Sequence, residues 1–120
     1  MRVPQRTPTV TDADVDRVAW RDYPAEHVEG VLKALAEYGT EDYEREPQRV
    51  RLAILKLANR DLEKLRSWVA QAKMDYRDVL GPAEYPLYGK KWGRMDHLSE
   101  EEQRSIIESD WAQYERWLKS

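Results

Sequence analysis

Residues 61–80 carry the strongest structural signal in the sequence, an apolar pattern with the spacing of packed helices. Its apolar positions alternate between steps of three and four residues, at Leu62, Leu65, Val69, Ala72, Tyr76 and Val79. This spacing is typical of the seam along which one helix packs against another, in a bundle or a short coiled coil. We therefore expect one helix over 61–80, ended by the Gly81-Pro82 pair, that buries its seam against further helices.

Two helices are expected before this segment, near the start of the chain. Thr11 is a suitable N-cap for a short helix over residues 12–22, which must stop before Pro24. The apolar stripe of residues 25–38 predicts a second helix, and Gly39 supplies a residue that tolerates the left-handed conformation at its C-terminal end.

Two more helices are expected around and after the central signal. Residues 47–58 begin with proline, which suits a first helical position, and their apolar residues predict the most buried helix of the chain. Asn59 is a suitable left-handed terminator for it. Ser99 and Glu102 form a capping box that predicts a final helix over residues 100–118.

These patterns predict an all-α fold, a small array or bundle of about five helices. The helices over residues 47–58, 61–80 and 100–118 are expected to form the central bundle. Residues 82–96 contain two prolines, two glycines and several aromatic residues, and are expected to form one ordered loop with aromatic and basic side chains. No internal repeat and no convincing strand pattern is present.

The length of 120 residues suits a single core. We expect a single helical domain over residues 11–120, preceded by a flexible N-terminal arm over residues 1–10. The first ten residues lack the apolar run of a signal peptide, and the longest apolar stretch, residues 52–58, is too short to cross a bilayer. A cytoplasmic location without a membrane partner is the resulting expectation.

The chain lacks the residues that several kinds of functional site require. The chain contains no cysteine, which excludes disulfides, thiolate nucleophiles and zinc–thiolate sites, and its glycines form no phosphate-binding loop. The two histidines, His27 and His97, are not placed for a di-iron site, and His27 between two glutamates is interpreted as a surface residue. We expect no cofactor and no specific metal, although a Mg²⁺ or Ca²⁺ site made only of carboxylates stays open.

One group of acidic residues is a candidate for chemistry. Asp75 and Asp78 lie one turn apart near the C-terminal end of the expected 61–80 helix, where the helix dipole disfavours acids, and Glu84 follows closely. The three could bind a cation or act as acid and base, as in a carboxylate-dependent hydrolase or metal enzyme. The interpretation that we favour is ion pairing with Arg77 or with basic residues of the following segment.

A second candidate is the segment 85–94, which interleaves aromatic rings and positive charges. Its rings belong to Tyr85, Tyr88 and Trp92, and its charges to Lys90, Lys91 and Arg94. Single-stranded nucleic acids are bound by such combinations, and acidic or phosphorylated protein partners fit equally well. The third alternative is that the rings pack onto the helices while the cations remain in solvent. With a net charge of -3, the chain as a whole is a poor nucleic-acid binder.

Part of the sequence resembles a group of short uncharacterised bacterial helical proteins. The resemblance is carried by the runs over residues 52–58 and 61–65, by Asp-Tyr-Arg-Asp-Val-Leu at 75–80 with Ala-Glu-Tyr-Pro at 83–86, and by residues 98–118. It covers roughly the last 70 residues. The resemblance implies a bacterial, intracellular, standalone domain, and it supplies no functional residue because the group has no established activity.

The aromatic residues favour an interaction function. The chain has five Trp, seven Tyr and no Phe, and the last helix places Trp111, Tyr114 and Trp117 on one broad face. Such rings dominate binding energies where they are desolvated. We therefore expect a non-enzymatic protein-interaction or structural module with a protein partner or self-association. A binder of nucleic acid or another polyanion and a carboxylate-dependent enzyme are the alternatives.

Overall fold

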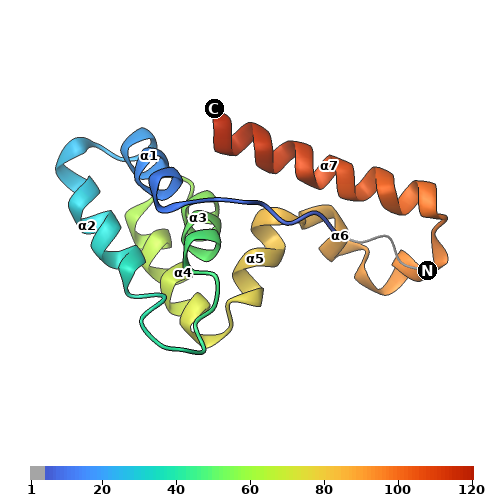
Figure 1. Ribbon diagram of the computed structural model, residues 1–120, viewed down its shortest axis with the longest axis horizontal. Helices are drawn as coiled ribbons and strands as arrows, with labels where there is room; N and C mark the ends of the chain where they lie inside the picture. Colours follow the sequence, from blue (N-terminus) through green and yellow to red (C-terminus); the bar gives the residue numbers. More distant parts are fainter. Residues whose placement is uncertain (1–4) are drawn as a thin grey trace.

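The computed structural model describes residues 5–120, and over this range the chain is helical with no β-strand (Figure 1). The predicted all-α class is confirmed, whereas the predicted count of about five helices is too low. The described residues form α1 (Asp12–Asp22), α2 (Ala25–Ala36), α3 (Pro47–Ala58), α4 (Leu62–Met74), α5 (Arg77–Glu84), α6 (Pro86–Lys90), the 3₁₀ helix η1 (Trp92–His97) and α7 (Glu100–Lys119). None of these helices is both long and apolar enough to cross a membrane.

Four of the helix ends that local residue chemistry predicts are confirmed. The side chains of Thr11 and Ser99 accept the expected backbone N–H groups and form complete capping boxes at α1 and α7. Gly39 follows α2 with a φ of +107°, and Asn59 ends α3 in the left-handed conformation with a φ of 49°. As expected, α3 is the most buried helix, with fully buried residues at Val50, Leu52, Ala53, Ile54, Leu55 and Ala58.

The predicted continuous helix over residues 61–80 is wrong, because the chain breaks at Asp75. This residue has an extended backbone, with φ of -159° and ψ of 106°. Its carboxylate accepts the backbone N–H of Arg77 at 3.0 Å, which satisfies an N–H group where α5 begins. The apolar seam still faces the core on both sides of the break, with buried residues at Leu65, Val69, Ala72 and Val79.

The predicted stop at Gly81-Pro82 is also wrong, since Pro82 lies inside α5. This helix ends instead at Glu84, before Tyr85 and Pro86. A residue that precedes proline is disfavoured in the α conformation, and Tyr85 has a φ of -139°. The Tyr85 N–H still bonds to the Gly81 carbonyl at 2.9 Å and closes the last turn.

The predicted loop over residues 82–96 is not a loop: it contains the end of α5, the helix α6 and most of η1. Pro86 begins α6, where its missing N–H costs no hydrogen bond. Asp110 in α7 accepts the next two backbone N–H groups, those of Leu87 and Tyr88, at 3.0 Å each. A carboxylate from a distant helix therefore caps α6.

The helices form a bundle with an extension rather than one central bundle (Figure 1). α1, α2, α4 and α5 pack around α3, and they build the main core. The expectation that the 100–118 helix joins the helices over 47–58 and 61–80 is wrong, because α7 packs mainly against α6 and α5. A second, smaller core of Tyr88, Met95 and Ile107 joins α6, η1 and α7.

The N-terminal part of the described chain contacts α7 in two places, near its first half and at its C-terminal end. Residues 5–10 run without helical structure from α1 toward the first half of α7, and residues 1–4 of the predicted arm lie outside the described residues. At the other end, Arg17 and Arg21 of α1 donate hydrogen bonds to the carbonyls of Leu118 and Trp117, at 2.7 and 2.6 Å. These bonds satisfy helix-end acceptors and hold the last turn of α7 to the bundle.

Candidate functional site

Two of the three candidate carboxylates are exposed or half-buried, and each has its own partner. Asp75 accepts two hydrogen bonds from the Arg77 guanidinium, both at 2.9 Å, and these bonds lower the pKa of the Asp75 carboxyl. Asp78 instead accepts a hydrogen bond from Gln71 Nε2 at 3.0 Å. Arg77 is among the ion-pair partners that the sequence predicts for these acids, and it pairs with Asp75. The sequence does not predict Gln71 as the partner of Asp78.

Glu84 is buried in the bundle and paired with α3. Its two oxygens accept hydrogen bonds from Arg49 Nη2 at 2.6 Å and Arg49 Nε at 2.8 Å. Burial raises the pKa of the Glu84 carboxyl, while the bonds from Arg49 act in the opposite direction. Asp75, Asp78 and Glu84 therefore do not share one site. Among residues 5–120, no group of three or more His, Asp or Glu side chains is arranged to hold a metal ion.

The aromatic face of α7, formed by Trp111, Tyr114 and Trp117, is directed at the chain itself. Tyr114 is buried, its ring lies 5.6 Å from that of Trp117, and burial raises the pKa of its hydroxyl. The Arg21 guanidinium lies over the Trp117 ring at 5.2 Å, and that of Arg6 lies over the Trp111 ring at 4.3 Å. Most of this face is thus used within the fold.

The rings of segment 85–94 form a contiguous cluster with one exposed member. Tyr85 and Tyr88 meet edge to face at 6.1 Å, and the Tyr88 ring lies 5.7 Å from that of Trp92. Tyr88 is buried in the smaller core. Trp92, in contrast, is 60% exposed, and Leu87 on the preceding turn is 39% exposed. The sequence indicates that these rings lie close together, but it does not indicate which of them is accessible to solvent.

The three cations of this segment lie close in sequence to the exposed Leu87 and Trp92. Lys90, Lys91 and Arg94 are exposed, and none forms an ion pair with another described residue. We name Leu87, Lys90, Lys91, Trp92 and Arg94 the α6–η1 surface. Its residues combine accessible apolar area with positive charge, a combination suited to binding but lacking a nucleophile or a paired acid and base.

The α6–η1 surface is held by hydrogen bonds that come largely from α7. Asp110 caps α6, and Gln103 Nε2 donates to the carbonyls of Met95 and Leu98 at 2.9 and 3.1 Å. Both polar residues are buried and occupy the same helical stripe as Ile107 and Tyr114. A polar residue within an apolar stripe is a signal that sequence inspection could have used to find these contacts.

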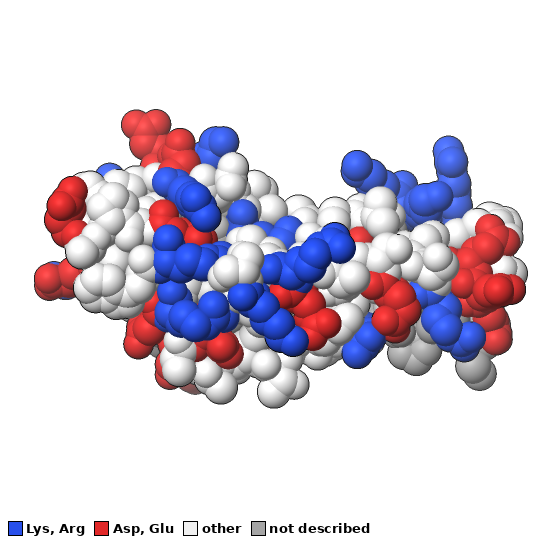
Figure 2. All heavy atoms as spheres, turned by 90° about the horizontal axis from the view of Figure 1, so that it is seen from above, with Lys and Arg blue, Asp and Glu red and all other residues white. Residues whose placement is uncertain are grey.

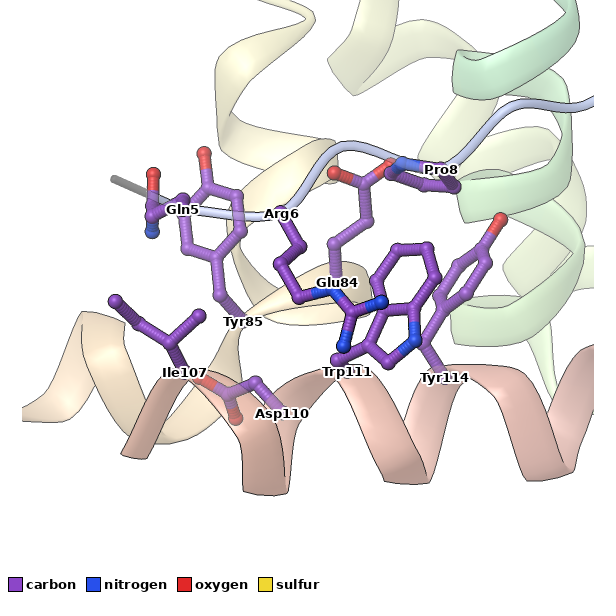
Figure 3. Close-up of a pocket in the computed structure, with 9 residues that line it drawn as sticks. All are labelled: Gln5, Arg6, Pro8, Glu84, Tyr85, Ile107, Asp110, Trp111 and Tyr114. Atoms are coloured by element: carbon purple, nitrogen blue, oxygen red, sulfur yellow. The ribbon is translucent and has the colours of Figure 1, made fainter. Parts of the chain in front are cut away.

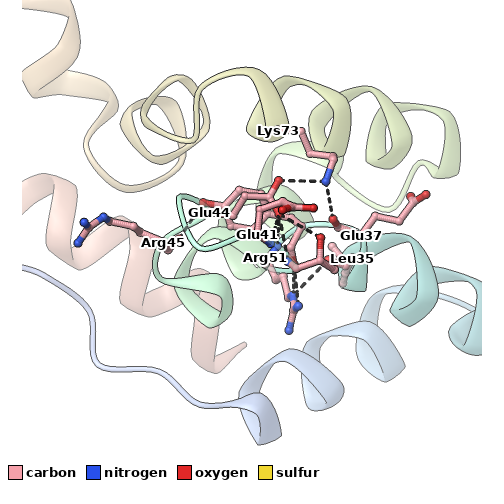
Figure 4. A network of polar contacts seen from close by, with 10 residues as sticks. Leu35, Glu37, Glu41, Glu44, Arg45, Arg51 and Lys73 are labelled. Carbon is pink, nitrogen blue, oxygen red and sulfur yellow. Dashed lines mark hydrogen bonds and ion pairs between the residues drawn. The ribbon is translucent and has the colours of Figure 1, made fainter.

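Another buried carboxylate, that of Glu44, organises the connection between α2 and α3 (Figure 4). Glu44 accepts the backbone N–H groups of Gly39, Thr40 and Glu41 at 3.0–3.2 Å and the ammonium of Lys73 at 3.0 Å. Burial raises the pKa of Glu44, but these hydrogen bonds outweigh it and lower the pKa to about 2. The sequence gives this connector only as a charged stretch, and we interpret Glu44 as a structural residue.

On the face shown in Figure 2, Lys and Arg side chains (blue) gather across the middle of the molecule, with Asp and Glu side chains (red) between and around them. Among the described residues, the α6–η1 surface combines exposed apolar side chains with cations that form no ion pair with another described residue. No family model, curated protein or solved structure matches the chain.

Proposed function

We propose that this chain is a non-enzymatic protein-interaction module whose α6–η1 surface binds an acidic, apolar segment of a partner protein. The observation that carries the proposal is Trp92, a large aromatic residue that is 60% exposed and next in sequence to cations that form no ion pair with another described residue. Tryptophan is among the residues that contribute most to binding energy when a partner covers them. Leu87 adds further apolar area that a partner would remove from water.

The charges of the surface define the chemistry of the partner. Lys90, Lys91 and Arg94 are exposed and without ion pairs within the described chain, so an acidic segment would gain new charge pairs without breaking existing ones. Exposed pairs contribute little affinity each, and they mainly accelerate association and select against basic partners. The affinity should therefore come from Trp92 and the selectivity from the cations.

The contacts that hold the surface in place support a binding role. Tyr88 and Met95 are buried beneath it, and Asp110 and Gln103 fix the backbone of α6 and η1 through hydrogen bonds. A preformed surface loses little conformational freedom when it binds a partner. Trp92 is held against the Tyr88 ring at 5.7 Å, which orients its indole before any partner arrives.

A protein partner is favoured over nucleic acid by the size of the charged area. Binding of single-stranded nucleic acid requires several stacking rings along a continuous positive groove. Here Tyr88 is buried, Trp92 is the exposed ring of the segment, and the net charge of the chain is -3. The surface therefore offers one stacking position and a small positive field.

A peptide-display selection against the full chain tests the proposal. Random dodecapeptides would be selected on the wild-type protein and on two variants, Trp92→Ala and Trp20→Ala. Trp20 is a matched control because it is 58% exposed but lies on α1. We expect the wild type and Trp20→Ala to enrich peptides that combine Asp or Glu with Leu, Trp or Phe, and Trp92→Ala to enrich none of them.

Binding of a nucleic acid or of a second copy of the chain to this surface would overturn the proposal. A fluorescein-labelled oligo(dT) that binds the wild type more tightly than any selected peptide, with an affinity that falls steeply with salt, would show a nucleic-acid binder. A concentration-dependent dimer in sedimentation that Trp92→Ala abolishes would show that the occupant is a second copy of the chain. If the wild type and both variants select the same peptides, the α6–η1 surface is not the binding site for these peptides.

A further inference from the structure

The N-terminal segment, residues 5–8, lies in a groove between α5 and α7 (Figure 3). We name this groove the α5–α7 groove. It is lined by Glu84, Tyr85, Ile107, Asp110, Trp111 and Tyr114. Pro8 is buried there, although the segment has no helical structure and precedes the first helix. The free volume left between segment and groove is only about 10 Å³, close to the space of one water molecule.

Arg6 makes two contacts of different kinds with α7. Its guanidinium carbon lies 4.3 Å from the centre of the Trp111 ring, and its Nη1 donates to Glu108 Oε2 at 2.7 Å. The first is a cation–π contact, and the second is a charge-assisted hydrogen bond. The Trp111 ring and the Glu108 carboxylate thus bind the planar guanidinium of Arg6 together. A lysine ammonium would fit this pair of contacts less well.

The backbone of the segment contributes no comparable attachment. Within the described chain, no backbone–backbone hydrogen bond joins residues 5–8 to any helix. The segment is held by the Arg6 contacts with Trp111 and Glu108 and by the burial of Pro8. An extended segment that is recognised through alternate side chains binds in the manner of a peptide ligand, and release would break no secondary structure.

We propose that the α5–α7 groove is a recognition site for extended segments of partner proteins that carry an arginine two residues before a proline. In this inference, Arg6 and Pro8 act as an internal occupant of the site. The inference is independent of the α6–η1 surface, because it uses a different groove and a basic ligand. It also assigns a use to Trp111, which the α6–η1 proposal does not involve.

Because residues 5–8 are covalently linked to α1, a partner segment must compete with them for the α5–α7 groove. A tethered ligand on a short linker competes at an effective concentration on the order of millimolar. A partner segment of the same chemistry therefore binds the wild-type chain weakly unless a second contact assists it. Weakening the internal occupant should expose the site, so the full chain with a substituted segment is the appropriate receptor.

A titration followed by NMR tests this inference with a defined probe. The probe is the synthetic peptide Gln-Arg-Thr-Pro-Thr-Val, which has the sequence of residues 5–10. The receptors are ¹⁵N-labelled full chains: wild type, Arg6→Ala, and Arg66→Ala as the control at an exposed arginine of α4. The indole N–H signal of Trp111, assigned from a Trp111→Phe variant, reports on the site.

The expected result is a shift of the Trp111 signal in Arg6→Ala that the peptide moves back toward its wild-type position. Half-saturation should require several-fold less peptide for Arg6→Ala than for wild type or Arg66→Ala. A probe with alanine in place of its arginine should leave the signal unmoved. If Arg6→Ala is unstable, Arg6→Lys keeps the charge and should give an intermediate shift.

Three outcomes would overturn the inference. One is a Trp111 signal in Arg6→Ala that does not respond to the peptide at several millimolar. Another is a Trp111 signal that is identical in wild type and Arg6→Ala. The third is an Arg6-dependent dimer of the wild-type chain, which would make a second copy the occupant.

Discussion

The carboxylate of Asp110 in α7 accepts the backbone N–H of Tyr88 in α6 at 3.0 Å, and it accepts the N–H of Leu87 at the same distance. The first N–H groups of a helix have no partner within the helix, and a side chain usually provides one locally. Here the acceptor comes from a helix that begins ten residues after α6 ends. Asp110 therefore links the start of α6 directly to α7.

Replacing Asp110 should destabilise this half of the molecule. Asp110→Ala leaves the buried N–H of Tyr88 and the partly buried N–H of Leu87 without an acceptor. We expect the free energy of unfolding to fall by about 1–3 kcal/mol. Urea denaturation at neutral pH measures the change. Glu101→Ala, at an exposed position of the same helix, serves as the control and should change stability by less than about 0.5 kcal/mol. Equal stability of the two variants would contradict the capping role.

The contribution of Glu44 should disappear in acid. Its hydrogen bonds lower the pKa in the folded chain to about 2, below the ordinary value of 4.5. A group with a lowered folded pKa stabilises the fold fully above its unfolded pKa and loses that contribution as pH falls through the folded pKa. The stability difference between wild type and Glu44→Gln should therefore be largest above pH 4.5 and shrink toward pH 2. A difference that does not vary with pH in urea titrations would show that Glu44 is not ionised in the fold.

Two glycines should respond to alanine in opposite directions. Gly39 has a φ of +107°, and an added Cβ would lie 2.8 Å from Pro47 Cβ and 2.9 Å from Arg51 Nη2. We expect Gly39→Ala to cost at least about 1–3 kcal/mol of stability from backbone strain alone. Gly30 lies within α2 with no atom in the way, so Gly30→Ala should stabilise by about 0.5–1 kcal/mol. Thermal denaturation of both variants checks the signs, and two changes of the same sign would contradict the local geometry.

Tyr114 should tolerate the loss of its hydroxyl. Its Oη is buried and has no hydrogen-bond partner among the described residues. An unsatisfied buried hydroxyl costs free energy, so Tyr114→Phe should leave stability unchanged or raise it by up to about 2 kcal/mol. Tyr38→Phe is the matched comparison, because the Tyr38 hydroxyl donates to the Arg45 carbonyl at 2.8 Å and its loss should destabilise. A Tyr114→Phe variant that is less stable than Tyr38→Phe would contradict this assignment.

Local chemistry in the sequence predicts several helix ends correctly, whereas the capping of α6 comes from a distant residue. The caps at Thr11 and Ser99 and the left-handed Gly39 and Asn59 depend on neighbouring residues, and the structure confirms them. The N-terminal end of α6, in contrast, is capped by Asp110, more than twenty residues away. No local pattern contains that partner, so the segment was expected to be a loop.

The same division applies to the candidate residues. Periodicity placed Trp111, Tyr114 and Trp117 on one face of a helix, but it could not indicate that this helix packs on α6 and α5 and turns the face inward. Likewise, Glu84 was grouped with acids close to it in sequence. Its partner, Arg49, lies 35 residues earlier and comes from another helix.

The affinity of a selected acidic peptide for Trp92→Ala, compared with Trp20→Ala, tests the central claim most directly. The two tryptophans are exposed to nearly the same extent, 60% and 58%, so loss of a large exposed ring is matched between the variants. The account predicts that Trp92→Ala weakens binding by about tenfold or more, a change of about 1.4 kcal/mol, and that Trp20→Ala binds like the wild type. Equal affinities for both variants, measured by fluorescence anisotropy, would contradict it.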